Sequence, residues 1–573
     1  MPTFTLNCTL NSIRQVSKAL FATALLTSTV GLSACFDDDD DSSSDSPSTP
    51  VVETNYSTVT FRPVGGYTHG GFDESASEIN AYHPASKRSF VVNAQNGKID
   101  VLDMTDVTNP TFVQALDASD LGGAVNSVAI HDDVMALAVQ ADSKTDNGFV
   151  AFYDANTLER LSSVEVGALP DMVTFSPDGD YALVANEGEP DDDYVIDPEG
   201  SVSVINVMDL NRPIVKTATF TDFNSQKQSL MDAGMRIFGE KADGTASTVA
   251  EDLEPEYIAL SEDGKTAFVS LQENNAIAVV DVMSATVSDI YALGAKDHSL
   301  AGNGLDVSNK DDAINIKNWP IMGMYQPDAI ATYAVNGKTY LVTANEGDAR
   351  EWGDFSEEIG FEDVTVDTSV FNETSCNGMA CDDNEALGKI DFTSVLGDTD
   401  NDGVYEALYS FGARSFSIWD TTDMTKPVYD SGDFMAQFTA DKYPDNFNAS
   451  NDDNSLDDRS DNKGVEPEGV TIGKVGSQTI AFIGLERISS VMAFDVTDPT
   501  AVEFLGEINT RTFDDAKLES ASYGTADPDA DGDLGPEGLT FVSADDSPNG
   551  KPLLIVGFEV SGTTRVFELD FAE

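Results

Sequence analysis

Carboxylates recur at matching points of a repeated unit, and they are the side chains of this sequence best suited to chemistry. Each clear copy of the unit opens on Pro followed by an acid, runs through a short strand and a tight turn, and ends its second strand in Glu. The clear copies open at Pro170-Asp171, Pro255-Glu256, Pro327-Asp328, Pro467-Glu468 and Pro536-Glu537. Weaker copies open at Ser77-Glu78 and Asn126-Ser127.

The repeat predicts fourteen positions near one end of a central channel, and eleven of them are acidic. First-strand starts supply Glu78, Ser127, Asp171, Glu256, Asp328, Glu468 and Glu537. Second-strand ends supply Gln95, Gln140, Glu187, Glu273, Glu346, Glu486 and Glu559. Eleven carboxyl groups that lie this close together cannot all be ionised unless positive charge compensates them. Oxygen donors, with only four His in the chain, favour bound Ca²⁺, with Mg²⁺ or Mn²⁺ next. The alternative is that these acids cap strands and accept backbone N–H groups.

Three arginines fall beside these acids, namely Arg350, Arg414 and Arg487. They suit an anion clamp for phosphate or carboxylate. Internal ion pairing with the acids is the other interpretation, and the sequence favours it slightly.

Two loops carry the alternating carboxylates and glycine of a calcium loop. They comprise Asp398, Asp400 and Asp402 before Gly403, and Asp527, Asp529, Asp531 and Asp533 around Gly532. An EF-hand has Glu at loop position twelve, but the first loop has Tyr409 there and the second has Gly538. Both loops are therefore predicted to bind calcium without the flanking helices of an EF-hand. Solvated acidic loops are the alternative.

The repeat also predicts the elements that position these acids. Seven units of about four short strands, with turns such as Ser176-Pro177-Asp178-Gly179, indicate an all-β, seven-bladed β-propeller. The last unit lacks a fourth strand and the segment Tyr56 to Pro63 lacks a partner, so we expect these two ends to pair and close the ring. A β-sandwich array or a β-solenoid explains neither feature.

Long insertions gather in connections of one kind, those expected on a single face of the ring. They span about 187–200, 221–253, 295–325, 346–404, 433–465 and 511–534. Loops collected on one rim of a rigid scaffold predict the functional face.

The N-terminal segment predicts export. Arg14 and Lys18 precede an apolar stretch that ends Leu32-Ser33-Ala34-Cys35, which resembles a bacterial lipobox with Cys35 as the lipidated residue. An ordinary secretory signal is the alternative. Residues 1–35 are thus a predicted lipoprotein signal peptide, 36–55 an acidic Ser/Pro-rich tether, and 56–573 the propeller. The predicted location is the outer membrane, facing the periplasm or cell surface, with membrane contact through the lipid only.

Charge and cysteine content narrow the partners. With 101 Asp+Glu against 31 Lys+Arg, the net charge is −70. Such a surface repels the phosphate backbone, so nucleic acid is not an expected partner. Cys376 and Cys381 are close in sequence and predicted to be outside the cytoplasm, so a disulfide is expected. Two free thiols or a metal pair are the alternatives.

Five long strings resemble the bacterial choice-of-anchor I family. They are TYLVTANEGDARE, FGARSFSIWD, SDNKGVEPEGVTIG, AFIGLERISSVMAFDVTDP and GPEGLTFVSADDSPNGKPLLIVGFEVSGT. The resemblance covers nearly everything after the tether. It implies a secreted or surface propeller, in a family whose members are often labelled alkaline phosphatase-like or cell-surface glycoprotein-like, and such labels are weak because propellers host many functions.

Two functions from different classes fit these features. The favoured one is a lipid-anchored, calcium-binding surface module that binds or scaffolds an unidentified partner. The alternative is a metal-dependent phosphoester hydrolase, alkaline phosphatase- or phytase-like, in which axial carboxylates hold Ca²⁺ and an arginine holds phosphate. A purely structural role in the envelope is a third possibility. Catalytic residues cannot be named from the sequence.

Overall fold

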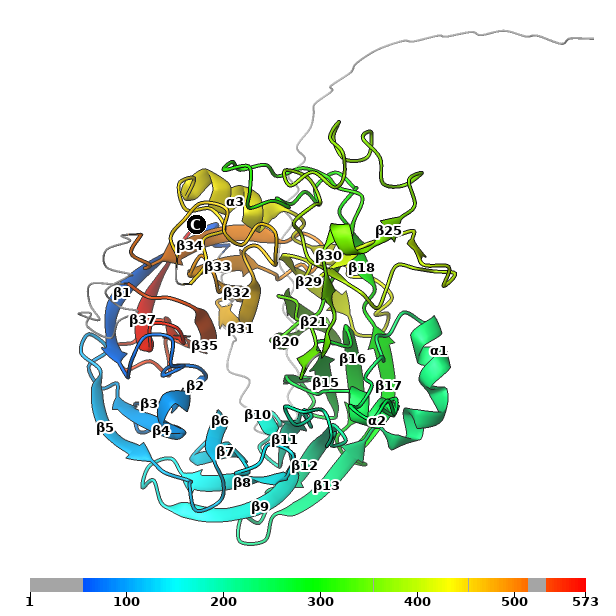
Figure 1. Cartoon of the computed structure of the whole chain (residues 1–573). Helices are drawn as coiled ribbons and strands as arrows, with labels where there is room; N and C mark the ends of the chain where they lie inside the picture. The colour runs from blue at the N-terminus through cyan, green and yellow to red at the C-terminus, as the bar shows by residue number, and fades with distance from the viewer. Residues whose placement is uncertain (1–54, 354, 452, 514–531) are drawn as a thin grey trace, which may run out of the picture. The chain divides into compact units, whose positions relative to one another are not determined.

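Four-stranded antiparallel sheets make up most of the computed structural model, which describes residues 55–353, 355–451, 453–513 and 532–573. The predicted signal peptide, Cys35 and nearly all of the tether lie outside these residues, as do Asp527, Asp529 and Asp531. The all-β fold is confirmed, and the sheets form a β-propeller (Figure 1).

Seven sheets in the described residues have four strands each. The first three are β2 (Asn80–His83), β3 (Arg88–Asn93), β4 (Lys98–Asp103) and β5 (Thr111–Leu116); β6 (Ala124–His131), β7 (Val134–Gln140), β8 (Asn147–Asp154) and β9 (Arg160–Ala168); and β10 (Pro170–Phe175), β11 (Tyr181–Asn186), β12 (Ser201–Asn206) and β13 (Ile214–Thr219). The next two are β14 (Ile258–Leu260), β15 (Thr266–Leu271), β16 (Ala276–Asp281) and β17 (Thr286–Ala292); and β20 (Ile330–Val335), β21 (Lys338–Asn345), β29 (Ser415–Asp420) and β30 (Tyr429–Asp430). The last two are β31 (Pro467–Val475), β32 (Gln478–Leu485), β33 (Ser490–Asp495) and β34 (Glu503–Asn509); and β35 (Pro536–Val542), β36 (Leu553–Phe558), β37 (Thr563–Ala572) and β1 (Thr58–Thr68).

The innermost strands of successive sheets contact one another. The order of contact is β2, β6, β10, β14, β20, β31 and β35, and β35 contacts β2 in turn. Tight turns join first to second strands, as in the turn whose Gly179 N–H donates to the Ser176 carbonyl at 2.8 Å. Gly179 has φ +72°, a conformation that glycine adopts without steric cost.

The core consists of apolar layers between neighbouring sheets. A buried cluster joins each sheet to the next all the way round, including one between the last sheet and the first. In that last layer, Val91 and Leu102 pack with Leu553 and Ile555, all fully buried. Each such side chain contributes about 1.5–3 kcal/mol of hydrophobic stabilisation. The strands are therefore apolar on both faces, as the continuous apolar runs of the sequence predict.

The N-terminal strand pairs with the last strand of the chain. β1 runs antiparallel to β37 from Thr58↔Ala572 to Thr68↔Thr563. It is longer than the predicted segment Tyr56 to Pro63, because a register shift between Pro63 and Gly65 lets pairing resume beyond Pro63. Val59 and Phe61 of β1 are buried against Phe482 and Phe567.

Most of the remaining elements lie in the insertions. The helices are η1 (Ala94–Asn96), η2 (Thr221–Gln226), α1 (Lys227–Asp232), α2 (Val249–Asp252), η3 (Phe361–Asp363) and α3 (Phe434–Lys442). The short strands are β18 (Ala295–Asp297), β19 (Met322–Met324), β22 (Glu351–Trp352), β23 (Phe355–Ser356), β24 (Glu358–Ile359), β25 (Thr365–Val366), β26 (Phe392–Thr393), β27 (Val404–Tyr405) and β28 (Tyr409–Ser410). None of the helices in the described residues is long and apolar enough to cross a membrane.

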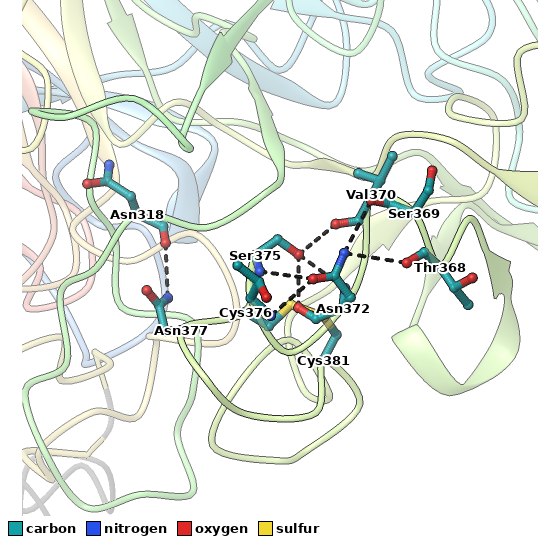
Figure 2. The surroundings of a disulfide bond; sticks show 10 residues. Asn318, Thr368, Ser369, Val370, Asn372, Ser375, Cys376, Asn377 and Cys381 are labelled. Atoms are coloured by element: carbon teal, nitrogen blue, oxygen red, sulfur yellow. Dashed lines mark hydrogen bonds between the residues drawn. A yellow bond between two sulfur atoms is a disulfide. The ribbon is translucent and has the colours of Figure 1, made fainter.

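The insertion 346–404 shares a buried core with the insertion 295–325, and a disulfide lies in it. Trp319, Phe371 and Leu387 are among its buried residues. The expected bond between Cys376 and Cys381 is present, with Cα atoms 5.4 Å apart. Figure 2 shows its surroundings, where Asn377 donates to the Asn318 carbonyl at 3.0 Å and so ties this insertion to 295–325.

Candidate functional site

Three of the acids at the first-strand starts lie at an irregularity of the strand that begins at a Pro. Asp171, Glu468 and Glu537 each fall where the register of the innermost strand shifts, directly after Pro170, Pro467 and Pro536. A bulge turns a side chain out of the strand's regular alternation. Glu78, Glu256 and Asp328 instead precede their strands.

The second-strand acids follow immediately after, or two residues after, their strands. Glu187, Glu346, Glu486 and Glu559 directly follow β11, β21, β32 and β36, and Glu273 lies two residues past β15. In three sheets the backbone N–H of this Glu donates to the carbonyl of the residue before the Pro. The pairs are Glu187 to Leu169 at 2.9 Å, Glu486 to Glu466 at 2.9 Å and Glu559 to Gly535 at 2.8 Å. The repeated bond brings the two acidic positions of one sheet together.

Groups of carboxylates come within ligand distance of one another among the described residues. In each of four groups, one oxygen per residue lies within 4.8 Å of the others. Three are axial: Glu78, Glu537 and Glu559; Asp328, Glu346 and Glu468; and Glu346, Glu466 and Glu486. Of the predicted axial acids, Asp171, Glu187, Glu256 and Glu273 belong to none of these groups. The ring is therefore divided, with its closest approaches on the later sheets and the first.

Two of these groups hold a buried oxygen without a hydrogen-bond partner in the described part of the chain. Oε2 of Glu537 and Oε2 of Glu468 are both in this state, as is Oε2 of Glu273. A buried carboxylate oxygen without a partner is costly. The donor set thus fits a hard cation, because oxygen-only ligands with a full negative charge are those that Ca²⁺ prefers.

Burial and mutual repulsion shift the titration of these acids. Burial, reinforced by Glu559 and Asp171, raises the pKa of Glu78 to about 8. Burial and Glu189 raise the pKa of Asp171 to about 6. The same causes, burial first, raise the pKa values of several others well above the usual range: Glu187, Glu256, Asp328, Glu468, Glu486 and Glu537. Without a cation, part of the ring is therefore protonated near neutral pH.

One axial group is already neutralised by side chains. Lys463 Nζ lies 2.7 Å from Glu346 and 3.5 Å from Glu466, and Arg487 Nε lies 2.9 Å from Glu466. Burial alone would raise the pKa of Glu466, but Lys463, Arg487 and Arg459 together lower it to about 2. Sequence reasoning missed Lys463, Arg459 and Glu466, although Glu466 stands directly before a repeat Pro.

A cavity of about 310 Å³ lies among the first-strand starts. Glu78, Asp171, Asp328 and Glu537 line it together with apolar side chains such as Leu539. The repeat therefore places acids from four different sheets around one hollow. Such a concave site with a few convergent polar groups is typical of ligand binding.

Arg350 is deeply buried in an ion-pair cluster of its own. It donates to Asp252 Oδ1 at 3.1 Å and to Glu254 Oε2 at 2.9 Å, and only 1% of the residue is exposed. Arg236, also buried, pairs with Glu357 next to it. These contacts favour internal ion pairing over an anion clamp at Arg350. Nothing periodic in the sequence marks Asp252, Arg236 or Glu357, because all three lie in insertions.

The other two arginines are also bonded to protein oxygens. Arg414 donates to the carbonyls of Asp306 at 2.6 Å and Ser460 at 2.9 Å. Arg487 bonds Glu466 and lies 3.1 Å from Glu486. An anion here would have to compete with these contacts.

The two predicted calcium loops differ in how far the structure describes them. Asp398 accepts the backbone N–H groups of Asp402 and Gly403 at 3.1 and 2.9 Å. Its carboxylate is grouped with those of Asp400 and Glu406, so Glu406 takes the place predicted for Asp402. Of the four acids of the second loop, Asp533 is the one that the structure describes, and its Oδ1 accepts from Arg565 Nε at 2.6 Å.

The sequence of this chain is similar to a known family and to known proteins. A sequence profile described as "Choice-of-anchor I domain" matches residues 78–499. Gigasin-3a of Magallana gigas is 30% identical over 32% of this chain and 64% of its own length. The mesenchyme-specific cell surface glycoprotein of Strongylocentrotus purpuratus is 29% identical over 49% of this chain and 40% of its own length. This chain thus spans less than two thirds of either relative.

Solved structures resemble the chain only distantly. The WD40 domain of Toxoplasma gondii coronin superposes with a TM-score of 0.42 at 10% identity, over 90% of this chain and 87% of that one. The Cps50 (Swd1) β-propeller domain of Myceliophteria thermophila gives 0.41 at 7% identity, over 89% and 99%. Likeness at this level has no bearing on function.

Proposed function

The chain belongs to the choice-of-anchor I domain family, and from that premise we propose that it is an exported, lipid-anchored β-propeller that binds Ca²⁺ at its channel mouth and acts as a surface binding or scaffold module. The observation that carries the metal assignment is the group of Glu78, Glu537 and Glu559 with its unpartnered buried oxygen on Glu537. The surface assignment is supported by the relative named a cell surface glycoprotein.

We further propose that the seven four-stranded sheets are the complete set of blades and that β1 closes the ring. Support comes from the β1–β37 ladder and from the apolar layer between the last sheet and the first. Asn80 Nδ2 donates to the Gly538 carbonyl at 2.7 Å, and Thr540 Oγ1 donates to the Asn80 carbonyl at 2.8 Å. Both bonds cross the same seam.

The preferred metal site lies across this seam. Glu78 comes from the start of the first sheet, and Glu537 and Glu559 come from the last. No Lys or Arg in the described residues forms an ion pair with any of the three, in contrast to the group around Glu466. A divalent cation held by these carboxylates would replace their repulsion by attraction and so join the two ends of the ring.

Thermal unfolding with and without Ca²⁺ tests this proposal. A ligand that binds only the folded state at a hundredfold excess over its Kd stabilises by about 2.7 kcal/mol. Chelator should therefore lower the Tm, and Ca²⁺ should restore it better than Na⁺ at matched ionic strength. Glu537→Gln keeps the side-chain shape and removes the charge, so it should lose most of the Ca²⁺-dependent shift.

Glu262→Gln is the matched control, because Glu262 is exposed in a hairpin turn and outside the acidic groups. Its Ca²⁺ response should equal that of the wild type. Identical responses in Glu537→Gln and wild type would contradict the axial site. Asp400→Asn then shows whether the remaining response belongs to the peripheral loop.

The alternative activity, phosphoester hydrolysis, is less favoured. Arg350, Arg414 and Arg487 are each bonded to protein oxygens, which leaves phosphate to compete with existing contacts. Turnover of p-nitrophenyl phosphate with Ca²⁺ that disappears with chelator would overturn the binding-module assignment. We expect no turnover under either condition.

The lipid anchor rests on Leu32-Ser33-Ala34-Cys35. Cys35→Ser should release the protein to soluble fractions or leave the precursor uncleaved. Unchanged processing and membrane fractionation would contradict the anchor.

A further inference from the structure

A second pocket, of about 600 Å³, lies among the insertions and shares no lining residue with the axial cavity. Three separate insertions form it. Tyr194 and Asp193 come from 187–200, Phe238 and Glu240 from 221–253, and Trp352 and Phe355 from 346–404. Loops far apart in the sequence therefore converge on one hollow.

Aromatic rings make up most of its larger side chains. The centroids of Phe238 and Phe355 are 6.1 Å apart and their planes are tilted by 44°. Phe355 is 41% exposed, so its ring is accessible from solvent. The indole Nε1 of Trp352 is buried and has no hydrogen-bond partner in the part of the chain that the structure describes.

Cationic side chains from outside the pocket lining lie over two of these rings, and each is ion-paired with a carboxylate. The guanidinium carbons of Arg236 and Arg350 each lie 5.1 Å from the centroid of Phe238, and Lys144 Nζ lies 4.8 Å from that of Trp352. Neither Lys nor Arg lines the pocket itself in the described residues, while Asp193 and Glu240 do and are both exposed. The pocket is thus both aromatic and negatively charged.

We infer that this pocket binds a small quaternary ammonium compound of the choline type. Aromatic faces attract a methylated ammonium group through their negative quadrupole while their carbon surface covers its methyl groups. Asp193 and Glu240 supply the opposite charge. An anion would be repelled by these carboxylates, and a bare metal ion would gain nothing from four rings.

Tryptophan fluorescence provides a direct readout. The chain has three Trp, and Trp319 and Trp419 are 1% and 0% exposed, so a small quencher or ligand acts first on Trp352. Choline should change the fluorescence saturably and give the same Kd by calorimetry. Dimethylbutanol, in which carbon replaces the ammonium nitrogen, should bind at least about tenfold more weakly. Equal affinity for the two compounds would overturn the proposal.

Point variants locate the site. Phe355→Ala and Glu240→Gln should each weaken choline binding about fivefold or more and leave the Tm unchanged, because both side chains are exposed. Phe112→Ala is the matched control, since Phe112 on β5 is 45% exposed and outside the pocket. Unchanged affinity in both pocket variants would overturn the proposal.

Two further arms separate other ligands from this one. Binding of cellobiose in place of choline, or binding to phosphatidylcholine vesicles without binding to free choline, would overturn the proposal. The experiment is independent of the axial metal, since choline affinity should be the same in Ca²⁺, in chelator and in Glu537→Gln.

Discussion

At the scale of single residues, buried glutamates have different roles according to whether neighbouring cations compensate their negative charge. Glu466 stands directly before the repeat Pro of its sheet, and Glu537 stands directly after that of its own. The pKa of Glu466 is held down by Lys463, Arg487 and Arg459 against the effect of burial. The pKa of Glu537 is raised by burial and by Glu78 and Glu559. Only the second kind of residue gains from a bound cation.

Arg350 offers a test of internal pairing at this scale. Arg350→Met should leave Asp252 and Glu254 buried without their cation, which costs about 3–5 kcal/mol. If Arg350 served only as an anion clamp, the variant would unfold no more readily than the wild type. Urea unfolding at pH 7 measures the difference. Lys265→Met is the control, since Lys265 pairs with Asp263 and both side chains are exposed, by 69% and 59%, and such pairs contribute about 0–1 kcal/mol. A loss under 1 kcal/mol for Arg350→Met would disprove the structural role.

His298 gives a pH prediction with a defined sign. Burial, followed by Lys296, lowers its pKa to about 3 from 6.5, so below pH 6.5 the unfolded chain binds a proton that the folded protein does not. Stability from this group is complete above pH 6.5 and falls toward pH 3, by about 1.4 kcal/mol per pH unit. In the wild type the Asn303 carbonyl accepts a hydrogen bond from His298 Nδ1 at 2.7 Å. The side-chain amide of His298→Asn keeps a donor for this carbonyl. The variant should show a shallower acid slope than wild type, and equal slopes would refute the assignment.

At the scale of elements, the ends of the chain complete one sheet. β1 buries Val59 and Phe61 in the layer shared with β32 and β36. It also supplies the outer neighbour of β37. A strand edge left without that neighbour would expose backbone N–H and C=O groups together with apolar side chains.

Two truncations test this element. Removal of residues 1–68 deletes β1 and should lower the Tm sharply and promote association, because loss of Phe61 alone corresponds to about 3–5 kcal/mol. Removal of residues 1–54 leaves β1 intact and should not change the Tm. Scanning calorimetry with analytical ultracentrifugation measures both effects. Equal stability of the two truncated proteins would contradict closure by β1.

At the scale of the whole molecule, the dominant feature is negative charge gathered at the channel mouth. The net charge is −70, and repulsion within the folded state adds to burial in raising the pKa of Glu78 to about 8. The pKa of Glu78 in the unfolded chain is the usual 4.5. Between pH 4.5 and 8 in chelator, the folded protein therefore keeps a proton that the unfolded chain has released. Binding more protons when folded means that stability falls as pH rises.

This effect of pH on stability is best measured between pH 6.5 and 8, because histidines of the unfolded chain titrate below that range. In chelator the Tm should decrease across this window. With saturating Ca²⁺ it should hold or increase, because deprotonation then favours metal binding. A Tm in chelator that stays constant or rises would be inconsistent with the charged mouth.

The repeat by itself determined the strands, the turns and the positions of the axial acids. Alternating and continuous apolar runs predict strands wherever they occur. The Pro-acid pairs recur at the same point of the unit, and in three sheets the carbonyl before the Pro accepts the N–H of the Glu that follows the second strand, as at Gly535 and Glu559. Local, periodic constraints of this kind are legible in one sequence.

The tertiary structure alone decided which acids are neutralised and what the insertions build. Lys463, Arg236 and Asp252 come from insertions that follow no period, and their partners lie far away in the chain, as the Arg350–Asp252 pair does. The pocket of Tyr194, Phe238 and Trp352 depends likewise on three loops meeting in space. Such contacts arise from the packing of the whole ring, because residue type and spacing do not specify which distant loop a side chain will face.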